Sequence, residues 1–131
     1  MQLIHTASAP SPGGHYSQAV RDGDRVFTSG QVGVDPGTGL TPADFREEVR
    51  QCLTNLREVL SASGAELTDV IRTMCLLTDI RDFGVFNEEY ALFFGDHRPA
   101  RSTFGIALAG GFRVEIEAIA RIPHAAGEGA S

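Results

Sequence analysis

The segment from Val70 to Thr78 constrains the fold more than any other part of this 131-residue chain. Successive side chains of a strand point to opposite faces of its sheet. Both faces of this strand are apolar, with Val70, Met74 and Leu76 on one side and Ile71, Cys75 and Leu77 on the other. Neither face suits water, so we expect a central strand that is covered on both sides.

Two helices are expected, one on each side of this strand in the sequence. The first has an N-cap candidate in Thr41, with Pro42 at the first helical position. Apolar residues recur at three- and four-residue spacing from Phe45 to Leu60, and Gly64 is placed to end the helix in a left-handed conformation. The second helix is expected over about 82–94, with an aromatic stripe along one side.

Four further strands complete a ββαβαββ order. A hairpin is expected over about 16–20 and 25–32, because Asp-Gly separates the two β-rich runs. Two later strands are expected over about 100–108 and 112–122. The folded core therefore spans about 14–122 of a single domain, preceded by an irregular lead-in and followed by a flexible tail at 123–131.

This order leaves one face of the sheet without cover. Two helices can cover only one face, and a chain of this length has no further element to form a second layer. We therefore predict that the open face is buried by self-association into a closed homo-oligomer.

Composition and charge exclude several classes of protein. The formal charge is −6, which disfavours a nucleic-acid binder because a phosphate-binding groove needs clustered cations. No apolar run approaches the ~20 residues of a membrane span, and the first residues lack the pattern of a secretory signal. Cys52 and Cys75 stand far apart with no C-x-x-C arrangement. These features predict a reduced, cytoplasmic protein that binds no membrane.

Two charged residues on expected strands are candidates for chemistry. Arg101 lies just inside a strand, where its guanidinium would either hold a carboxylate of a ligand or pair with a surface acid. The segment from Phe112 to Arg121 alternates, with Glu115 and Glu117 on the less apolar face. That face is either solvated or enclosed by a neighbouring subunit, and an enclosed carboxylate is suited to proton transfer.

Other candidates carry less information by themselves. Asn87 lies beside the aromatic stripe of the second helix and either caps a loop or lines a pocket. Ser29 offers a hydroxyl at a strand end, where Gly30 permits close backbone approach. The four histidines lack metal-ligand spacing, and no phosphate-binding glycine motif occurs, so we expect no metal and no nucleotide cofactor.

Taken together, five segments in register resemble the YjgF/RidA family of enamine/imine deaminases. They are Tyr16-Ser17-Gln18-Ala19, Phe27-Thr28-Ser29-Gly30-Gln31, the run from Asp79 to Asn87, Pro99-Ala100-Arg101-Ser102-Thr103, and the run from Val114 to Ala120. The resemblance extends from about Gly14 to Ile122. It implies a chorismate-mutase-like α+β fold with two helices on one face of a mixed sheet. It also implies a homotrimer with ligand sites between subunits.

The family resemblance implies hydrolysis of 2-enamino or 2-imino acids to 2-keto acids and ammonia, without a metal or organic cofactor. Arg101 matches the arginine that binds the substrate carboxylate, and Glu115 matches the acid that positions the attacking water. The matching pocket positions are Tyr16, Ser29, Gly30, Asn87 and Thr103, the last being cysteine in some members. Such positioning fits the residue types, since it fixes an electrophilic carbon against water.

Some residues depart from the family pattern. His15 stands where many members have proline, Phe104-Gly105-Ile106 replaces a Val-Glu-Val type segment, and Ala109-Gly110-Gly111 replaces a Leu-Pro-Lys type turn. These changes favour a bulkier or less acidic ligand than a simple imino acid. Two alternatives therefore stay open: a non-catalytic, carboxylate-binding regulatory member of the family, and a pathway-specific enzyme acting on another unsaturated amine.

Overall fold

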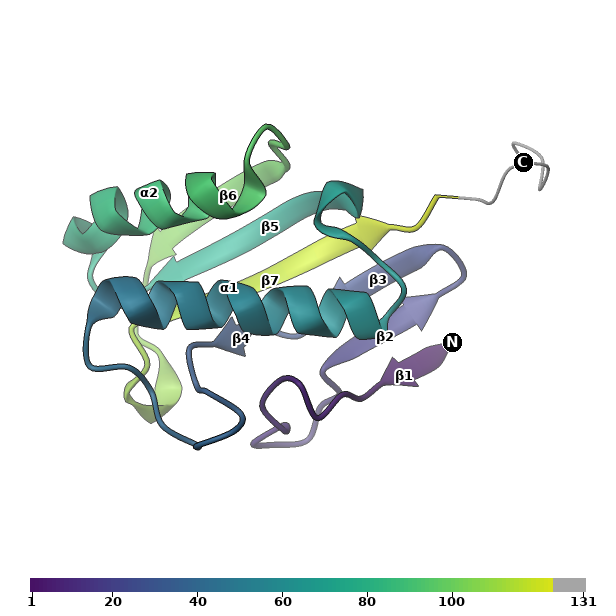
Figure 1. The fold of residues 1–131 in the computed structure, drawn as a ribbon, viewed down its shortest axis with the longest axis horizontal. Coiled ribbons are helices and arrows are strands. Elements are labelled where there is room, and N and C mark those ends of the chain that lie inside the picture. The colour runs from purple at the N-terminus through teal and green to yellow at the C-terminus, as the bar shows by residue number, and fades with distance from the viewer. Residues whose placement is uncertain (124–131) are drawn as a thin grey trace.

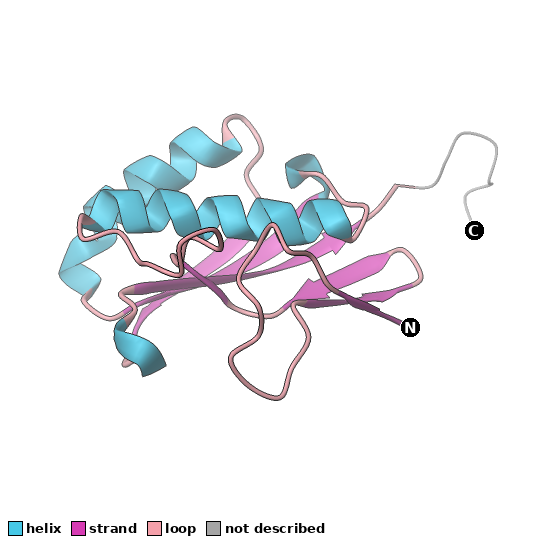
Figure 2. Cartoon of the chain, turned by 60° about the horizontal axis from the view of Figure 1, so that its bottom comes forward, coloured by secondary structure: helices cyan, strands magenta, loops and turns pink. Residues whose placement is uncertain are grey.

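The computed structural model describes residues 1–123. Within residues 1–123, both α-helices lie side by side across the same face of a single twisted sheet (Figures 1 and 2). This architecture confirms the predicted α+β class, with both helices on the same face. The tail predicted at 123–131 falls almost wholly outside the described residues.

The sheet has seven strands of mixed direction. They are β1 (Gln2–Ile4), β2 (Ala19–Asp22), β3 (Arg25–Thr28), β4 (Gln31–Val32), β5 (Val70–Leu77), β6 (Ala100–Gly105) and β7 (Val114–Arg121). The order is β1-β2-β3-β7-β5-β6, and β4 pairs with β7 beyond the end of β3. The β5–β6 pair is parallel, and every other pair is antiparallel. β5 has a strand on each side, as expected, but it lies next to the edge strand β6 and is not central. The predicted hairpin is present as β2 and β3, although its first strand begins at Ala19 rather than near residue 16.

The helices are α1 (Phe45–Ala62) and α2 (Phe83–Phe94), and three short 3-10 turns occur at Leu67–Asp69, Ile80–Asp82 and Ala109–Gly111. The predicted start of α1 at Thr41 is wrong. Asp44 is the N-cap, and its carboxylate accepts a hydrogen bond from the Glu47 amide at 3.0 Å. Gly64 has φ of +89°, as the sequence predicted for the end of this helix.

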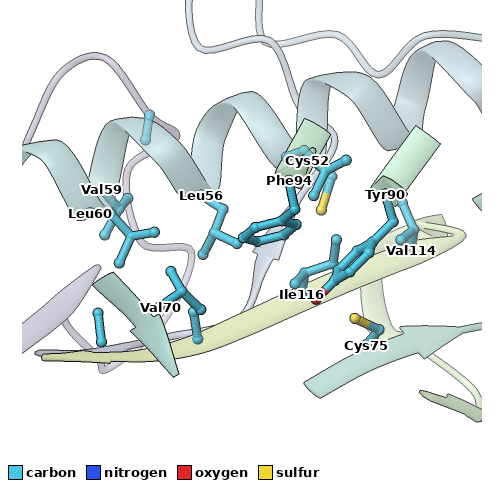
Figure 3. Packing of buried hydrophobic residues seen from close by; sticks show 14 of the residues in the cluster. Cys52, Leu56, Val59, Leu60, Val70, Cys75, Tyr90, Phe94, Val114 and Ile116 are labelled. Atoms are coloured by element: carbon cyan, nitrogen blue, oxygen red, sulfur yellow. The ribbon is translucent and has the colours of Figure 1, made fainter. Parts of the chain in front are cut away.

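The hydrophobic core lies between the helices and the sheet. Figure 3 shows Cys52 and Leu56 of α1 and Tyr90 and Phe94 of α2 directed toward Ile116 of β7. Both cysteines are free and buried within this core. Along β7, residues 114, 116, 118 and 120 are buried under the helices, so the predicted alternation of this strand is correct.

A register shift changes the predicted faces of β5. The strand bulges between Val70 and Arg72, so Val70 is buried on the helix side together with Cys75 and Leu77. Ile71 was expected on that side and is instead 46% exposed. One extra residue in a strand inverts the alternation before it, and the sequence pattern carries no sign of this irregularity.

The first residues are more ordered than predicted. Gln2–Ile4 forms β1 and pairs with β2, and the buried Gln18 side chain holds the following loop. Its amide oxygen accepts from the Thr6 backbone at 2.7 Å, and its nitrogen donates to the Pro10 carbonyl at 2.9 Å. The predicted strand over 25–32 is interrupted at Ser29 and Gly30, and β6 ends three residues earlier than predicted.

The face of the sheet opposite the helices carries large apolar side chains. Phe27 of β3 is 46% exposed and Phe104 of β6 is 49% exposed, while Met74, Leu76 and Ile119 are half-buried there. This is the face that the sequence predicts to be covered by self-association. Within residues 1–123, no helix is long and apolar enough to cross a membrane.

Candidate functional site

Arg101 lies on the helix-covered face of β6, at the edge of the sheet. It pairs in register with Thr73 of β5, which is buried against α2. Directly opposed residues on neighbouring strands share a face, so the Arg101 side chain extends beneath α2 rather than toward the open side. The Tyr90 hydroxyl, at 2.7 Å from Thr73 Oγ1, ties α2 to the same position.

The Arg101 guanidinium is held by an amide and an aromatic wall. Its Nη1 donates to Asn87 Oδ1 at 2.9 Å, and its Cζ lies 4.7 Å from the centre of the Tyr90 ring. The rings of Phe83 and Phe86 are 5.5 and 5.8 Å from the same atom. Cation–π contacts and a neutral amide orient the guanidinium without neutralising it. In residues 1–123 no carboxylate forms an ion pair with Arg101, which leaves its charge available to a ligand.

A cavity of about 410 Å³ adjoins this guanidinium. Its wall comes from the C-terminal half of α2, the connection to β6 and Arg101 itself. The lining residues are Asn87, Tyr90, Ala91, Phe94, Gly95, His97, Arg98, Pro99 and Arg101. The sequence placed Tyr90 only on the aromatic stripe of the second helix and gave no role to His97 or Arg98. The position of Arg98 directly before the Pro99-Ala100-Arg101 segment was the available signal.

Thr103 lies two residues beyond Arg101 on the same face, opposite Cys75. Its Oγ1 is buried and has no hydrogen-bond partner among the described residues. A buried hydroxyl without a partner costs free energy, so this oxygen is suited to a ligand atom that supplies the missing bond. Burial raises the pKa of the neighbouring Cys75 thiol to about 11, so that thiol remains protonated at neutral pH.

Glu115 occupies the open face of β7, next to Gly30. A Cβ atom added at Gly30 would lie 2.6 Å from Cδ of Glu115, so the carboxylate packs where a side chain of residue 30 would stand. Burial, and secondarily the charge of Glu117, raises the pKa of Glu115 above that of an ordinary glutamate. Glu117 itself is exposed, so the enclosed carboxylate of this strand is Glu115.

The remaining predicted residues surround Gly30. Ser29 Oγ donates to the Ser17 carbonyl at 2.6 Å, which fixes the bend between β3 and β4. Tyr16 is 53% exposed and, with Gly30, lines a second cavity of about 230 Å³. Its hydroxyl accepts a hydrogen bond from the Gly13 amide at 3.1 Å. His15 is exposed, and Phe104 points to the open face rather than into the cavity beside Arg101.

The predicted site residues therefore form two separate groups within one chain. The Arg101 group, defined as Arg101, Asn87 and Thr103, lies on the helix side. The Glu115 group, defined as Glu115, Gly30, Tyr16 and Ser29, lies at the open face and its edge. Arg101 is opposite Thr73 and Glu115 is opposite Leu76, so the two positions differ by two strands across and three residues along. Two strands across the sheet and three residues along a strand each correspond to roughly 10 Å, and the backbone of the sheet lies between the two side chains.

Comparison with known proteins assigns the family. A family model described as Endoribonuclease L-PSP matches residues 6–122. The crystal structure of the YjgF gene product from E. coli superposes with a TM-score of 0.89 at 38% identity, covering 92% of this chain and 98% of that one. The chain belongs to the YjgF/RidA family. This YjgF/RidA member is thus correctly recognised from its five sequence segments.

Two other relatives bear on the chemistry of the YjgF/RidA member. A protein of Rattus norvegicus named 2-iminobutanoate/2-iminopropanoate deaminase is 46% identical over 121 residues, covering 91% of this chain and 88% of that protein. The E. coli protein TdcF, whose crystal structure contains bound serine, superposes with a TM-score of 0.91 at 39% identity. That superposition covers 94% of this chain and all of TdcF.

Residues 1–123 contain no cluster of three or more histidine, cysteine, aspartate or glutamate side chains arranged to hold a metal ion. The groups that could act on a ligand are therefore an arginine, a carboxylate with a raised pKa, an amide and hydroxyls. Such a set can anchor an anion, orient water and move a proton.

Proposed function

We propose that this protein hydrolyses 2-imino acids to 2-keto acids and ammonia, and that 2-enamino acids react after tautomerising to the imine. The observation that carries this proposal is the Arg101 guanidinium, held by Asn87 and aromatic rings beside a cavity without a carboxylate partner. The rat relative, 46% identical and named for two 2-imino acids, supports the same substrate class.

Arg101 binds the substrate carboxylate through its guanidinium fork. The fork geometry suits two parallel hydrogen bonds to a carboxylate, and the contact with Asn87 fixes its plane. Anchoring the carboxylate places the adjacent C=N carbon at a defined position. The unpartnered hydroxyl of Thr103, two residues along the same face, supplies a further hydrogen bond to the bound molecule. Binding in this way accelerates hydrolysis by holding the imine carbon in the orientation in which water attacks it.

Glu115 orients the attacking water and carries a proton. The carboxylate accepts a proton as the water oxygen bonds to the imine carbon, and it returns a proton to the nitrogen. The resulting carbinolamine loses ammonia and leaves the 2-keto acid, so one water is consumed for each C=N bond broken. A raised pKa brings Glu115 closer to neutrality, where a carboxyl group exchanges protons most effectively.

The active site forms between copies of the chain. Arg101 and Glu115 lie on opposite faces of one sheet, so a single copy does not direct both at one small molecule. The open face carries half-exposed phenylalanines at 27 and 104, which suits burial against a second copy. We propose a closed homotrimer in which the Arg101 group of one copy meets the Glu115 group of the next, with Tyr16 and Gly30 shaping the far wall.

The reaction as written needs no metal and no organic cofactor, because water is the nucleophile and protein groups move the protons. A nuclease activity, suggested by the description of the family model, has less support in this chain. The net charge is −6, and the guanidinium of Arg101 adjoins a cavity of about 410 Å³ lined partly by aromatic rings rather than a surface stripe that would follow a phosphate backbone.

The test uses 2-iminobutanoate generated in situ by an amino-acid oxidase, with trapping of the residual imine and measurement of keto acid and ammonia. Wild-type protein is expected to accelerate hydrolysis over buffer. Arg101→Ala is expected to lose the acceleration, Arg101→Lys to retain part of it, and Glu115→Gln to lower kcat. Wild type no faster than buffer, or Arg101→Ala equal to wild type, would overturn the proposal. Binding of 2-oxobutanoate without turnover would instead support a regulatory, carboxylate-binding role.

A further inference from the structure

A second arginine lines the cavity beside Arg101. Arg98 lies in the connection between α2 and β6 and lines the same space of about 410 Å³. Among the described residues, neither Arg98 nor Arg101 forms an ion pair, although most other arginines of the chain do. The proposed function uses only Arg101, so the charge of Arg98 remains to be explained.

The wall of this cavity holds no aspartate or glutamate. Its other members are an amide, aromatic rings and small side chains, and the adjacent Asp96 is exposed without lining the cavity. Two arginines therefore line one cavity in a chain whose net charge is −6. Like charges that share a concave, partly apolar site create a local positive potential that attracts a multiply charged anion.

The backbone that carries Arg98 is anchored at several points. The Gly95 amide donates to the Ala91 carbonyl at 2.9 Å, and the His97 amide donates to the Phe94 carbonyl at 3.2 Å. The His97 ring bonds through Nε2 to the Val70 carbonyl at 2.7 Å. A carbonyl only accepts, so Nε2 carries the proton and the ring ties the connection to β5. The backbone at Arg98 is thus held in place by these hydrogen bonds, although the Arg98 side chain is exposed.

We propose that Arg98 binds a second acidic group on the substrate, and that the preferred substrates of this protein are 2-imino diacids such as 2-iminosuccinate and 2-iminoglutarate. This inference rests on the proposed function. Arg101 holds the carboxylate next to the C=N carbon, the methylene groups lie against the Tyr90 and Phe94 rings, and the distal carboxylate pairs with Arg98. The bonds broken and formed remain those of the simple imine, with one water consumed and one ammonia released.

The departures from the family pattern suggested a bulkier or less acidic ligand. The volume of the cavity lies within the range of small-molecule sites. The two arginines in its wall favour a more acidic ligand, contrary to that expectation. Phe104, which prompted part of that expectation, lies on the other face of the sheet and does not contribute to this cavity.

The experiment compares full-length wild type, Arg98→Gln and Arg98→Lys on two imines made in situ, 2-iminoglutarate and 2-iminobutanoate. The quantity measured is the ratio of kcat/KM for the diacid to kcat/KM for the monoacid. Arg98→Gln is expected to lower this ratio about five- to tenfold, mainly through KM for the diacid, and Arg98→Lys to recover part of it. Arg81→Gln is the matched control, because it removes an equal charge from an 88% exposed side chain elsewhere and leaves the ratio unchanged.

The possible outcomes separate this inference from the proposed function. Turnover of 2-iminobutanoate with an unchanged ratio in Arg98→Gln would overturn the role of Arg98 and leave the deaminase proposal standing. A wild-type ratio below one would overturn the preference for diacids. No turnover of either imine by wild type would overturn both proposals. In parallel, 2-oxoglutarate is expected to raise the melting temperature of wild type more than 2-oxobutanoate does, and this difference should shrink in Arg98→Gln.

Discussion

Arg101 and Glu115 lie on opposite faces of the same sheet, on strands that both border β5. The guanidinium extends beneath α2, whereas the carboxylate packs against Gly30 at the open face. Among residues 1–123, neither side chain forms an ion pair with another residue of the same chain. The arrangement is explained if each group serves a site completed by a neighbouring copy.

The hydrogen bond from Arg101 to Asn87 makes a sharp test of carboxylate binding. Asn87→Asp preserves size but places a negative charge 2.9 Å from the guanidinium, where it competes with the substrate carboxylate. KM for 2-iminobutanoate is expected to rise about tenfold or more, with a smaller change in kcat. Asn87→Ala is expected to raise KM less, because it loosens Arg101 without neutralising it. Steady-state kinetics distinguish the two, and equal KM values for both variants would contradict this role.

Gly30 is expected to be required for the position of Glu115. Gly30→Ala places a methyl group on the carboxylate, which must move away, while the backbone has no clash of its own. We expect kcat/KM to fall about tenfold or more with little loss of stability, since small displacements of reacting groups are costly. Gly84→Ala is the control, because the space around Gly84 is open and residue 84 is helical. A fully active Gly30→Ala variant would argue against Glu115 as the group that orients water.

Glu115 is expected to lower the stability of the protein at neutral pH. Its raised pKa means that the folded state binds this proton more tightly than the unfolded state does. The stabilisation that comes from binding this proton is complete when the pH is below the ordinary glutamate pKa. It is lost as the pH rises through the pKa of Glu115 in the folded state. Glu115→Gln should therefore melt above wild type at about pH 7.5 and no higher than wild type at about pH 4.

Thermal melts at fixed protein concentration measure this effect. A Glu115→Gln variant that melts below wild type at neutral pH would indicate a stabilising role for the carboxylate, contrary to this account.

The buried Glu48 carboxylate supports the fold rather than the site. It accepts bonds from the Arg113 backbone at 2.8 Å and from Arg113 Nε at 2.6 Å, which joins α1 to the start of β7. Arg113→Ala leaves this carboxylate with fewer partners and should lower the free energy of unfolding by about 2–3 kcal/mol. The loss of unfolding free energy is smaller than for a fully buried ion pair, because the Arg113 side chain is partly exposed. Urea denaturation measures it, with Arg81→Ala as an exposed ion-pair control expected to change little.

Much of this fold follows from local sequence patterns. The alternation of β7 correctly separates buried Val114 from half-exposed Glu115, because a regular strand repeats every two residues. The same rule fails for Val70, where a bulge shifts the register. The helix start is misplaced because Thr41 and Asp44 both suit an N-cap, and only the folded chain shows which carboxyl or hydroxyl meets a free amide.

The site was harder to predict than the fold. Sequence resemblance identifies Arg101, Glu115 and Asn87 individually, but their grouping depends on strand order. The contact between Gly30 and Glu115 joins residues 85 positions apart, and it exists because β4 and β7 are neighbours. The exposed Arg98 belongs to no periodic pattern, and its role is suggested by its place in the cavity wall and by its position directly before the segment that contains Arg101.

Subunit complementation tests the central claim most directly. Arg101→Ala should lose the acceleration and Glu115→Gln should have a much lower kcat, and mixing the two by joint refolding should restore activity. In a cyclic trimer, every mixed assembly contains one interface with both wild-type groups, so equal mixing predicts about a quarter of wild-type activity. Arg101→Ala mixed with the double variant Arg101→Ala/Glu115→Gln is the control and should stay inactive. Recovery near that level would show that the two residues act from different copies, whereas activity no higher than that of the parent variants would contradict the account.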